Sequence, residues 1–465
     1  MDFDKEIMAL KEELVKSTQE VIRIKSVEGI SQPGMPFGKG PYDALCYVLE
    51  LGEKLGFKPK NLDGYAGHLD FGEGDEVVGV LGHLDVVPEG EGWTYPPFDG
   101  HIQDDRIYGR GAIDDKGPVI AALYAMKAIK ESGVRLNKKI RLILGTNEET
   151  GWGCMKHYFA NENPPNMAFT PDAEFPVIHG EKGIIVFDLV YKLESIYNDS
   201  FTLLSLEGGN AANMVPDYAQ AVIKVNEIDR AIDGLRRYAN EKGYQADIKE
   251  ENGNLKISIR GKSAHGSTPE KGENAITYLI DTLHSYFKGD ISFFKFLDWY
   301  DKSLAFKFNG ENFGCEFQDD ISGKLNLNVG VIKFVENKII ISINIRYPIS
   351  YKREDIYKSI KENLKDLPID IIEGKADKDP LYVPKDDKLV KTLMRVYQAQ
   401  TGDYKSEPLV IGGGTYARAM KNAVAFGPVF PGQEELAHQK DEFISIENLE
   451  KLTKIYAQAL YELAK

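Results

Sequence analysis

Acidic and histidine side chains recur in this sequence, most of them directly after short apolar runs. The set comprises His83, Asp85, Asp114, Asp115, Glu148, Glu149 and Asp172, with His438 in a charged segment late in the chain. Any one of these residues alone is more often a solvated surface charge or, for an acidic pair such as Asp114-Asp115, the start of a helix. Because carboxylates and imidazoles follow several separate runs, their co-occurrence favours a shared metal site.

Imidazole and carboxylate ligands together are typical of zinc, manganese or cobalt, whereas oxygen ligands alone favour magnesium or calcium. Two metal ions about 3.5–4 Å apart need a group that bridges them, and one aspartate can offer an oxygen to each ion. Two histidines and three carboxylates meet that need and leave a net positive site. Such a site acidifies a bound water molecule and polarises a carbonyl group.

Neighbouring residues of this set are expected to take different positions. Asp85 follows His83 by two residues, so the two share a face if strand geometry persists. We therefore expect the Asp85 carboxylate to lie behind the His83 ring and fix its tautomer. Glu148 and Glu149 are adjacent, and successive side chains that leave a strand point in different directions, so the pair can divide its work.

Apolar runs at 76–82, 138–145 and 167–173 predict buried strands, and the segment 117–132 has the periodicity of a helix. This strand–helix–strand alternation predicts an α/β domain with a mixed, largely parallel sheet flanked by helices. Functional residues in such sheets gather at the carboxyl ends of the strands. We therefore expect most of the acidic and histidine set on one rim of the sheet.

The middle of the chain has a different texture. It predicts strands at 183–193, 256–262, 327–348 and 369–374, with helices at 226–242, 273–288 and 352–366 among them. The segment 327–348 reads as a hairpin that turns at Glu336-Asn337. The α/β alternation then resumes with a helix at 388–402, a strand at 424–429 and a last helix whose N-cap is Ser445. The predicted architecture is an α/β domain of residues 1–182 and 379–465, interrupted by an inserted α+β domain of residues 183–378.

Composition limits the partners. The chain has 465 residues, long enough for two or three domains, and a net charge of −15 from 57 basic and 72 acidic residues. An acidic surface repels phosphate backbones and anionic lipids, so we expect a small-molecule substrate and neither a nucleic acid nor a membrane. Three cysteines without a CxxC pair suit a reducing compartment. No signal peptide and no bilayer-spanning run is recognisable, so a cytoplasmic protein is expected.

Five stretches together resemble motifs of the dinuclear zinc exopeptidases of the aminoacylase and carboxypeptidase group, most closely the bacterial dipeptidases of the PepV or carnosinase-like kind. They are GHLDVVPEGEGWTYPPFDG, GRGAIDDKGP, GTNEETGWGC, TPDAEFPVIHGEKG and LAHQKDE. The resemblance covers nearly the whole chain. It implies a zinc exopeptidase-like catalytic domain, a ferredoxin-like lid domain and hydrolysis of dipeptides. The long inserted domain resembles a lid that stands in for a dimer partner, which favours a monomer over a homodimer.

The resemblance also implies roles for individual residues. His83 and Asp172 resemble the ligands of one zinc ion, and Glu149 and His438 resemble those of the other. Asp114 resembles the carboxylate that bridges both ions, and the resemblance implies a cis peptide bond after this residue. Zinc is the expected metal, with manganese or cobalt as alternatives.

Other residues of the set resemble the groups that handle protons or hold the site in place. Glu148 resembles the general base, Asp85 the orienting acid and Asp115 a structural neighbour of the bridging carboxylate. In this mechanism Glu148 takes a proton from the attacking water and returns it to the leaving amine.

The inserted domain supplies further candidates by resemblance. His265 resembles the histidine that steadies the developing oxyanion, and Arg346 resembles the residue that binds the terminal carboxylate of the substrate. Asn213 is a weaker substrate-binding candidate, and Gly413 and Gly414 belong to a glycine-rich loop near that carboxylate. The bland alternatives are a surface turn residue for His265 and an exposed strand-end charge for Arg346.

Two rival functions remain open at this point. The first is an N-acyl amino acid deacylase or desuccinylase, which would use the same site with a different pocket for the amino end. The second is a non-catalytic protein on a peptidase fold, against which a complete ligand set and base argue.

The two adjacent glutamates give a first prediction. Glu148→Ala should retain both metal ions and lose activity by about 10²–10⁴-fold, because it removes only the proton carrier. Glu149→Ala should weaken the binding of one metal ion. Metal content by elemental analysis and activity, measured on the same preparations, separate the two. Equal loss of metal in both variants would contradict the assignment.

Overall fold

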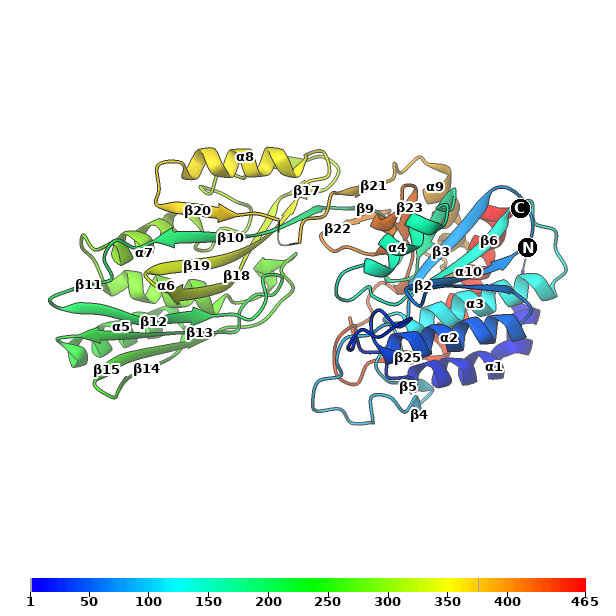
Figure 1. Cartoon of the computed structure of the whole chain (residues 1–465), viewed down its shortest axis with the longest axis horizontal. Coiled ribbons are helices and arrows are strands. Elements are labelled where there is room, and N and C mark those ends of the chain that lie inside the picture. The colour runs from blue at the N-terminus through cyan, green and yellow to red at the C-terminus, as the bar shows by residue number, and fades with distance from the viewer. Residues whose placement is uncertain (1, 375) are drawn as a thin grey trace. The chain divides into compact units, whose positions relative to one another are not determined.

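The computed structural model describes residues 2–374 and 376–465, which form two compact units (Figure 1). The first unit comprises Met1–Gly180, Tyr382–Leu409 and Gly414–Lys465. The second comprises Glu181–Leu381 together with Val410–Gly413. The chain therefore returns to the second unit for a short stretch late in the sequence, which the patterning of the sequence does not indicate.

The first unit is built on a mixed sheet. Its strands are β1 (Lys58–Leu62), β2 (Ala66–Phe71), β3 (Val77–His83), β6 (Lys139–Gly145), β7 (Met167–Thr170), β9 (Ile178–Glu181), β21 (Leu381–Tyr382), β22 (Leu409–Ile411) and β23 (Ala423–Ala425). They lie in the order β1-β2-β6-β3-β7-β23-β9-β21, with β22 beside β9. The central strands β6, β3, β7 and β23 are mutually parallel, and the pairs β1–β2, β2–β6 and β23–β9 are antiparallel. The predicted mixed, largely parallel sheet is confirmed.

Helices cover this sheet and explain its apolar strands. The helices are α1 (Asp4–Ile22), α2 (Lys39–Lys54), α3 (Lys116–Glu131), α4 (Gly153–Asn161), α9 (Lys388–Thr401) and α10 (Ile446–Ala464), with a 3-10 turn η2 (Tyr416–Ala419). α3 and α10 pack against each other and against β3 and β6, while α2 and α4 contact β2. Strands covered on both faces need apolar residues at successive positions, and all but the first residue of β3 and of β6 are buried.

Short strands complete the first unit. They are β4 (His101–Gln103), β5 (Arg106–Tyr108), β8 (Ala173–Glu174), β24 (Pro428–Val429) and β25 (Phe443–Ser445). β25 pairs with β5, which pairs with β4. β25 leads into α10, whose N-cap is Ser445, as predicted: its hydroxyl accepts from the amide of Asn448 at 3.1 Å.

The second unit is an antiparallel sheet with helices. Its strands are β10 (Gly183–Lys192), β11 (Tyr197–Asn198), β12 (Phe201–Gly208), β13 (Tyr218–Val225), β14 (Gln245–Glu251), β15 (Asn254–Arg260), β18 (Asn326–Val335), β19 (Lys338–Tyr347) and β20 (Ile369–Ile372), with a separate small pair β16 (Gln318–Asp319) and β17 (Gly323–Lys324). The helices are α5 (Ile228–Lys242), α6 (Ala275–Tyr286), α7 (Ser292–Ser303) and α8 (Arg353–Leu364), with a 3-10 turn η1 (Pro269–Lys271). The strand order is β14-β15-β13-β12-β18-β19-β10-β20, with β11 beside β12.

Burial alternates along strands β13 and β15 of the second unit, as expected where one face of a sheet is covered. In β13 and β15 every second residue is buried, and α5 and α6 contact both strands. β18 and β19 form the predicted hairpin, and Glu336 and Asn337 both have positive φ, at 47° and 59°, as a tight hairpin turn requires. The predicted α+β texture is confirmed.

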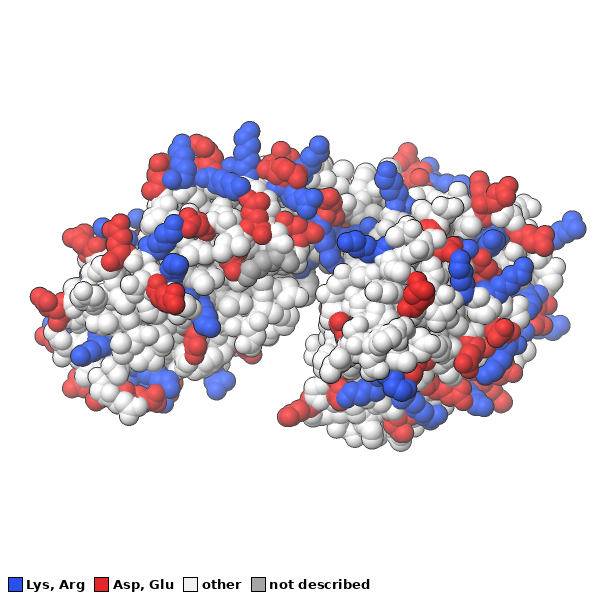
Figure 2. Space-filling model, viewed as in Figure 1, with Lys and Arg blue, Asp and Glu red and all other residues white. Residues whose placement is uncertain are grey.

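The surface carries both signs of charge. On the face shown in Figure 2, acidic and basic side chains intermingle over the surface. Such mixing produces no extended single-sign field on that face that would steer a long polyelectrolyte. Within the described residues, no helix is both long and apolar enough to cross a bilayer.

Close packing at the end of β6 gives a prediction about stability. A Cβ atom at Gly145 would overlap the ring and hydroxyl of Tyr416, whereas one at Gly151 would meet only the Asn147 side-chain oxygen, at 3.6 Å. Gly145→Ala should therefore destabilise the protein by about 1–3 kcal/mol through overpacking. Gly151→Ala, in the loop that follows, should change stability by less than about 0.5 kcal/mol. Denaturant unfolding of both variants checks this, and equal stabilities would contradict it.

Candidate metal centre

The ends of three parallel strands bring the acidic and histidine residues together. His83 is the last residue of β3 and is in register with Gly145, the last residue of β6. Glu148 and Glu149 follow in the turn after β6, and Asp172 follows β7 by two residues. Parallel strands that end at one level deliver their following residues to one rim, as the sequence predicts.

Asp114 contacts two histidines with different oxygens. Its Oδ1 lies 2.9 Å from His83 Nε2, and its Oδ2 lies 3.1 Å from His438 Nε2. Asp172 Oδ2 is 3.9 Å from the same nitrogen of His83, and Glu149 Oε2 is 3.0 Å from the same nitrogen of His438. Each imidazole therefore faces one private carboxylate and one oxygen of a shared carboxylate. The peptide bond after Asp114 is cis, as the resemblance implies.

The tautomer of His83 bears on what this arrangement can hold. Its Nδ1 lies 2.9 Å from the backbone oxygen of Asp85, which can only accept a hydrogen bond. Nδ1 therefore carries a proton, and in the neutral ring Nε2 presents a lone pair toward the oxygen of Asp114. Two electron-rich atoms at 2.9 Å need a proton or a metal ion between them. In a tetrahedral zinc site with bonds of 2.0–2.1 Å, ligand atoms lie about 3.3 Å apart, so these spacings fit a divalent ion.

Two overlapping groups of side chains could hold an ion. His83, Asp114 and Glu149 offer ligand atoms within 4.8 Å of one another, and so do His83, Glu148 and Asp172. The donor set is a mixture of imidazole nitrogen and carboxylate oxygen, which suits zinc, manganese or cobalt better than magnesium or calcium. The residues present therefore fit the metal ions that the sequence predicts.

Burial and neighbouring carboxylates raise the pKa values of acids at this centre. Burial, together with the neighbouring carboxylates of Glu149, Asp85 and Asp114, raises the pKa of Glu148 to about 8 against the lowering effect of His83. Burial and Asp114 likewise raise the pKa of Asp172 well above its usual range. A positive charge at this position would reverse these shifts, because it favours the ionised carboxylates.

Asp114 itself shifts the other way. Burial opposes its ionisation, but hydrogen bonds from His438 and His83 outweigh burial and hold the pKa of Asp114 below its usual range. The same contacts with Asp114 and Glu149 raise the pKa of His438 to about 11. The imidazoles thus act as the counter-charges of the shared carboxylate.

The contact of Asp85 differs from the expected one. Its carboxylate oxygen lies 3.6 Å from His83 Nδ1, and the backbone carbonyl of Asp85 accepts the hydrogen bond instead. The two carboxylate oxygens accept from the backbone amides of Glu148 and Glu149, at 3.0 and 3.1 Å. The chain turns after His83 so that the carbonyl faces the ring, and the side chain fixes the neighbouring turn.

Asp115 and Trp152 surround the candidate ligands. Asp115 is fully buried, and its Oδ2 accepts from the backbone amide of His83 at 3.1 Å, in keeping with the structural role expected for it. Trp152 donates from its indole nitrogen to Glu148 Oε1 at 2.9 Å. The sequence analysis does not single out Trp152, although its place in the TNEETGWG stretch, four residues after Glu148, was the available signal.

Four of the predicted substrate-binding and oxyanion residues, namely Asn213, His265, Arg346 and Gly413, lie in the second unit, and Gly414 lies in the first. Arg346 is 4% exposed and donates to Asn344 Oδ1 at 2.8 Å and to the Gly412 carbonyl at 2.7 Å. It is therefore not the exposed strand-end charge of the alternative interpretation. His265 is exposed, and its Nδ1 lies 2.6 Å from the hydroxyl of Ser267.

Backbone contacts tie the Asn213 and His265 loops together. The amide of Gly266 donates to the carbonyl of Asn213 at 2.7 Å, and Met214 forms an isolated bridge with His265. Asn328, 1% exposed, donates its amide to the carbonyls of Ala212 and Met214, both at 2.8 Å. These bonds fix the backbone on both sides of Asn213.

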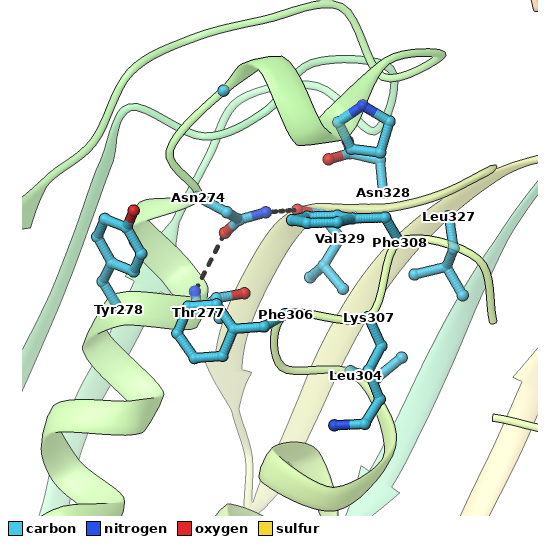
Figure 3. A pocket seen from close by; sticks show the side chains of 12 residues that line it. Asn274, Thr277, Tyr278, Leu304, Phe306, Lys307, Phe308, Leu327, Asn328 and Val329 are labelled. Atoms are coloured by element: carbon cyan, nitrogen blue, oxygen red, sulfur yellow. Dashed lines mark hydrogen bonds between the residues drawn. The ribbon is translucent and has the colours of Figure 1, made fainter. Parts of the chain in front are cut away.

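A small cavity adjoins Asn328 (Figure 3). Its volume is about 50 Å³, and its walls are mainly apolar, with Leu304, Phe308, Leu327 and Val329 among them. Asn274 closes one side by accepting from the amide of Thr277 and donating to the carbonyl of Val329. A volume of this size holds a few water molecules rather than a substrate.

The fold and this centre define a class of protein, a metal-dependent hydrolase. Residues 79–462 match the model of peptidase family M20/M25/M40, and the chain belongs to that family. It is 44% identical over 475 aligned residues to the putative dipeptidase YtjP of Bacillus subtilis, with 100% of each chain covered. It is 39% identical to a putative dipeptidase of Staphylococcus epidermidis, with 98% of each covered.

Solved structures share the fold. Human carnosine dipeptidase 1 has a TM-score of 0.60 at 16% identity, with 99% of this chain and 98% of that chain covered. Aminoacylhistidine dipeptidase from Vibrio alginolyticus has a TM-score of 0.59 at 16% identity, with coverage of 97% and 96%. At these identities the likeness concerns the fold alone.

The raised pKa of Glu148 predicts how the metal-free protein responds to pH. The unfolded glutamate ionises near pH 4.5 and the folded one near 8, so stability should fall as pH rises through this window. Glu148→Gln removes that loss and should make the metal-free protein more stable than wild type at pH 9, by on the order of 3 kcal/mol. The two should be similar at pH 4.5.

Unfolding of chelator-treated protein across this pH range provides the measurement. The raised pKa of His438 also makes stability fall above about pH 6.5, where the histidine of the unfolded chain loses its proton, but both proteins share that effect and it cancels in the difference. Glu435→Gln, at an exposed glutamate, is the matched control. The prediction is wrong if the free energy of unfolding changes with pH in the same way for wild type and for Glu148→Gln.

Proposed function

We propose that this chain is a dipeptidase that uses two divalent metal ions, with zinc as the first candidate and manganese or cobalt as alternatives. The observation that carries the proposal is the division of Asp114 between His83 Nε2 at 2.9 Å and His438 Nε2 at 3.1 Å. A carboxylate that meets two imidazoles with separate oxygens is what a bridge between two ions requires.

These contacts support the ligand assignment that the resemblance implies. His83 and Asp172 would hold one ion, Glu149 and His438 the other, and Asp114 both. When bound, the ions would acidify a water molecule and polarise the carbonyl of the scissile bond.

The protein's own groups would then handle the protons. Glu148 takes the proton of the attacking water and delivers it to the leaving amine, as a general base and then a general acid. Trp152 holds one carboxylate oxygen of Glu148 through its indole N–H, and Asp85 fixes the backbone of the turn that carries Glu148. A general base held at both ends loses little entropy when the substrate arrives.

Residues of the second unit, together with Gly414 of the first, would supply the remaining contacts. His265 would donate to the oxygen that gains charge during attack, and Arg346 would bind the terminal carboxylate of the substrate. Asn213 and the backbone of Gly413 and Gly414 are further substrate contacts. We therefore infer that residues 183–378 act as the lid and residues 1–182 and 379–465 as the catalytic domain. This assignment implies that the lid closes over the substrate.

Two relatives with 44% and 39% identity are named putative dipeptidases, which supports a dipeptide over an N-acyl amino acid as the substrate. The uninterrupted inserted segment supports a monomer, with a homodimer as the alternative. The free state of Cys46, Cys154 and Cys315 supports the reducing cytoplasm as the compartment.

Substrate and metal dependence can be tested together. The purified protein should hydrolyse unblocked dipeptides, lose that activity on chelation and recover it with zinc, manganese or cobalt. N-acetyl and N-succinyl amino acids should react at least about 10²-fold more slowly, because a site shaped for the amino end of a dipeptide gains no contacts from an acyl group. Rate constants for the substrate panel give the measurement.

Amidated dipeptides add a control for the carboxylate contact and should have a raised KM. Rapid deacylation without dipeptide hydrolysis would overturn the substrate assignment in favour of a deacylase. Absence of any hydrolysis with metal present would favour a non-catalytic role.

A further inference from the structure

Glu442 is a buried carboxylate outside the candidate ligand set. It follows His438 by four residues and is fully buried. Its Oε1 accepts hydrogen bonds from the backbone amides of Gly111, Ile113 and Asp114, at 3.0, 2.9 and 3.2 Å. One oxygen thus gathers three amides of the segment that carries the shared carboxylate.

The second carboxylate oxygen of Glu442 and its backbone carbonyl also link residues 109–114 to residues 438–442. Its Oε2 accepts from Arg110 at 2.7 Å, and the same guanidinium nitrogen donates to the carbonyl of Gln439 at 3.1 Å. The backbone carbonyl of Glu442 accepts from the amide of Gly109 at 2.9 Å. Residues 109–114 and 438–442 are therefore linked by a side chain and by the backbone, although more than 320 residues separate them.

A buried ion pair of this kind is weak evidence for a role in stability. Taking Glu442 and Arg110 out of water is costly, and apolar residues of similar volume often serve stability as well or better. What an apolar pair could not do is accept three amides at once. Those amides belong to the backbone that carries the Asp114 side chain, so holding them fixes where that side chain begins. Residues 438–442, which include Glu442, set the position of His438.

We propose that Glu442 is a positioning residue for the metal centre, which fixes the Asp114 carboxylate relative to His438 so that both can hold the same ion. The inference rests on the proposed function, because it needs the metal ions assigned above. Glu442 itself does not contact the ion. Groups that orient metal ligands without touching the metal commonly affect its binding about 10–100-fold.

Glu442→Gln is the direct test. The amide side chain keeps the shape but can no longer accept from the three amides and from Arg110 together. We expect the ion assigned to Glu149 and His438 to bind about 10–100-fold more weakly, as measured by zinc titration against a competing chelator. Glu435→Gln, at an exposed glutamate of the same segment, should bind zinc like wild type.

The titration separates failure of the inference from failure of the proposed function. If wild-type protein binds none of zinc, manganese and cobalt, the proposed function fails. If wild type binds two zinc ions and Glu442→Gln binds them with the same affinities, the inference is overturned while the proposed function stands.

A second variant separates positioning from general stability. Glu442→Gln leaves Arg110 buried without its carboxylate, so its melting temperature should fall. Replacing both residues by methionine, as Glu442→Met with Arg110→Met, removes the buried charges and should recover much of the melting temperature, yet the three amides then have no side-chain acceptor. Zinc affinity should therefore stay weakened in the double variant. Recovery of zinc affinity together with melting temperature would overturn the inference.

Discussion

The crowding of carboxylates at one rim of the sheet is the constraint on which the site depends. Asp114, Glu148, Glu149 and Asp172 converge there with only two imidazoles, and burial contributes to raising the pKa of three of these acids. In a space of low polarity, ionised carboxylates at these separations repel one another strongly. Bound metal ions would relieve this repulsion, because one divalent ion offsets the charge of several carboxylates. The rigid ends of β3, β6 and β7 supply the other requirement, since flexible acids would move apart.

The adjacent glutamates illustrate how neighbours can differ in role. Glu149 points to His438, at 3.0 Å, while Glu148 receives the indole N–H of Trp152. Both backbone amides are bound by the single carboxylate of Asp85, so the turn cannot rotate to exchange the two side chains. The division of labour that the sequence analysis assigns to Glu148 and Glu149 therefore has a structural basis in their different partners. Their functional roles themselves remain proposals.

Sequence patterning predicts best where burial is two-sided or turn chemistry is local. β3 and β6 read directly as apolar runs because helices cover both of their faces, and the hairpin at Glu336-Asn337 and the cap at Ser445 depend on nearby residues. β12 and β13 are not among the predicted strands, because only four of the eight residues of β12 and three of the eight residues of β13 are buried and polar residues interrupt the pattern. The return of Val410–Gly413 to the second unit carries no local signal at all.

The sequence likewise predicts some features of the site and not others. Residue types and spacing indicate the ligand set, since ligands must be His, Asp or Glu wherever they lie in the chain. They do not reveal that the carbonyl of Asp85, not its carboxylate, faces His83. Nor do they reveal Glu442, whose partners Gly111, Ile113 and Asp114 lie more than 320 residues away. Such roles are set by tertiary contacts that a single sequence does not display.

Three buried acids that are not assigned as ligands share one task. Asp85 accepts from the amides of Glu148 and Glu149, Asp115 accepts from the amide of His83, and Glu442 accepts from the amide of Asp114. Each backbone segment so held carries a candidate ligand. Neutral acceptors could fix the same backbone at a lower cost of burial. Burial raises the pKa of Asp115 and of Glu442, and a bound cation would favour their ionised forms. Their negative charge would in turn raise the affinity of the site for the cation, while the hydrogen bonds keep them from competing as ligands. The cost of burying these acids is thus consistent with selection for metal binding rather than for stability.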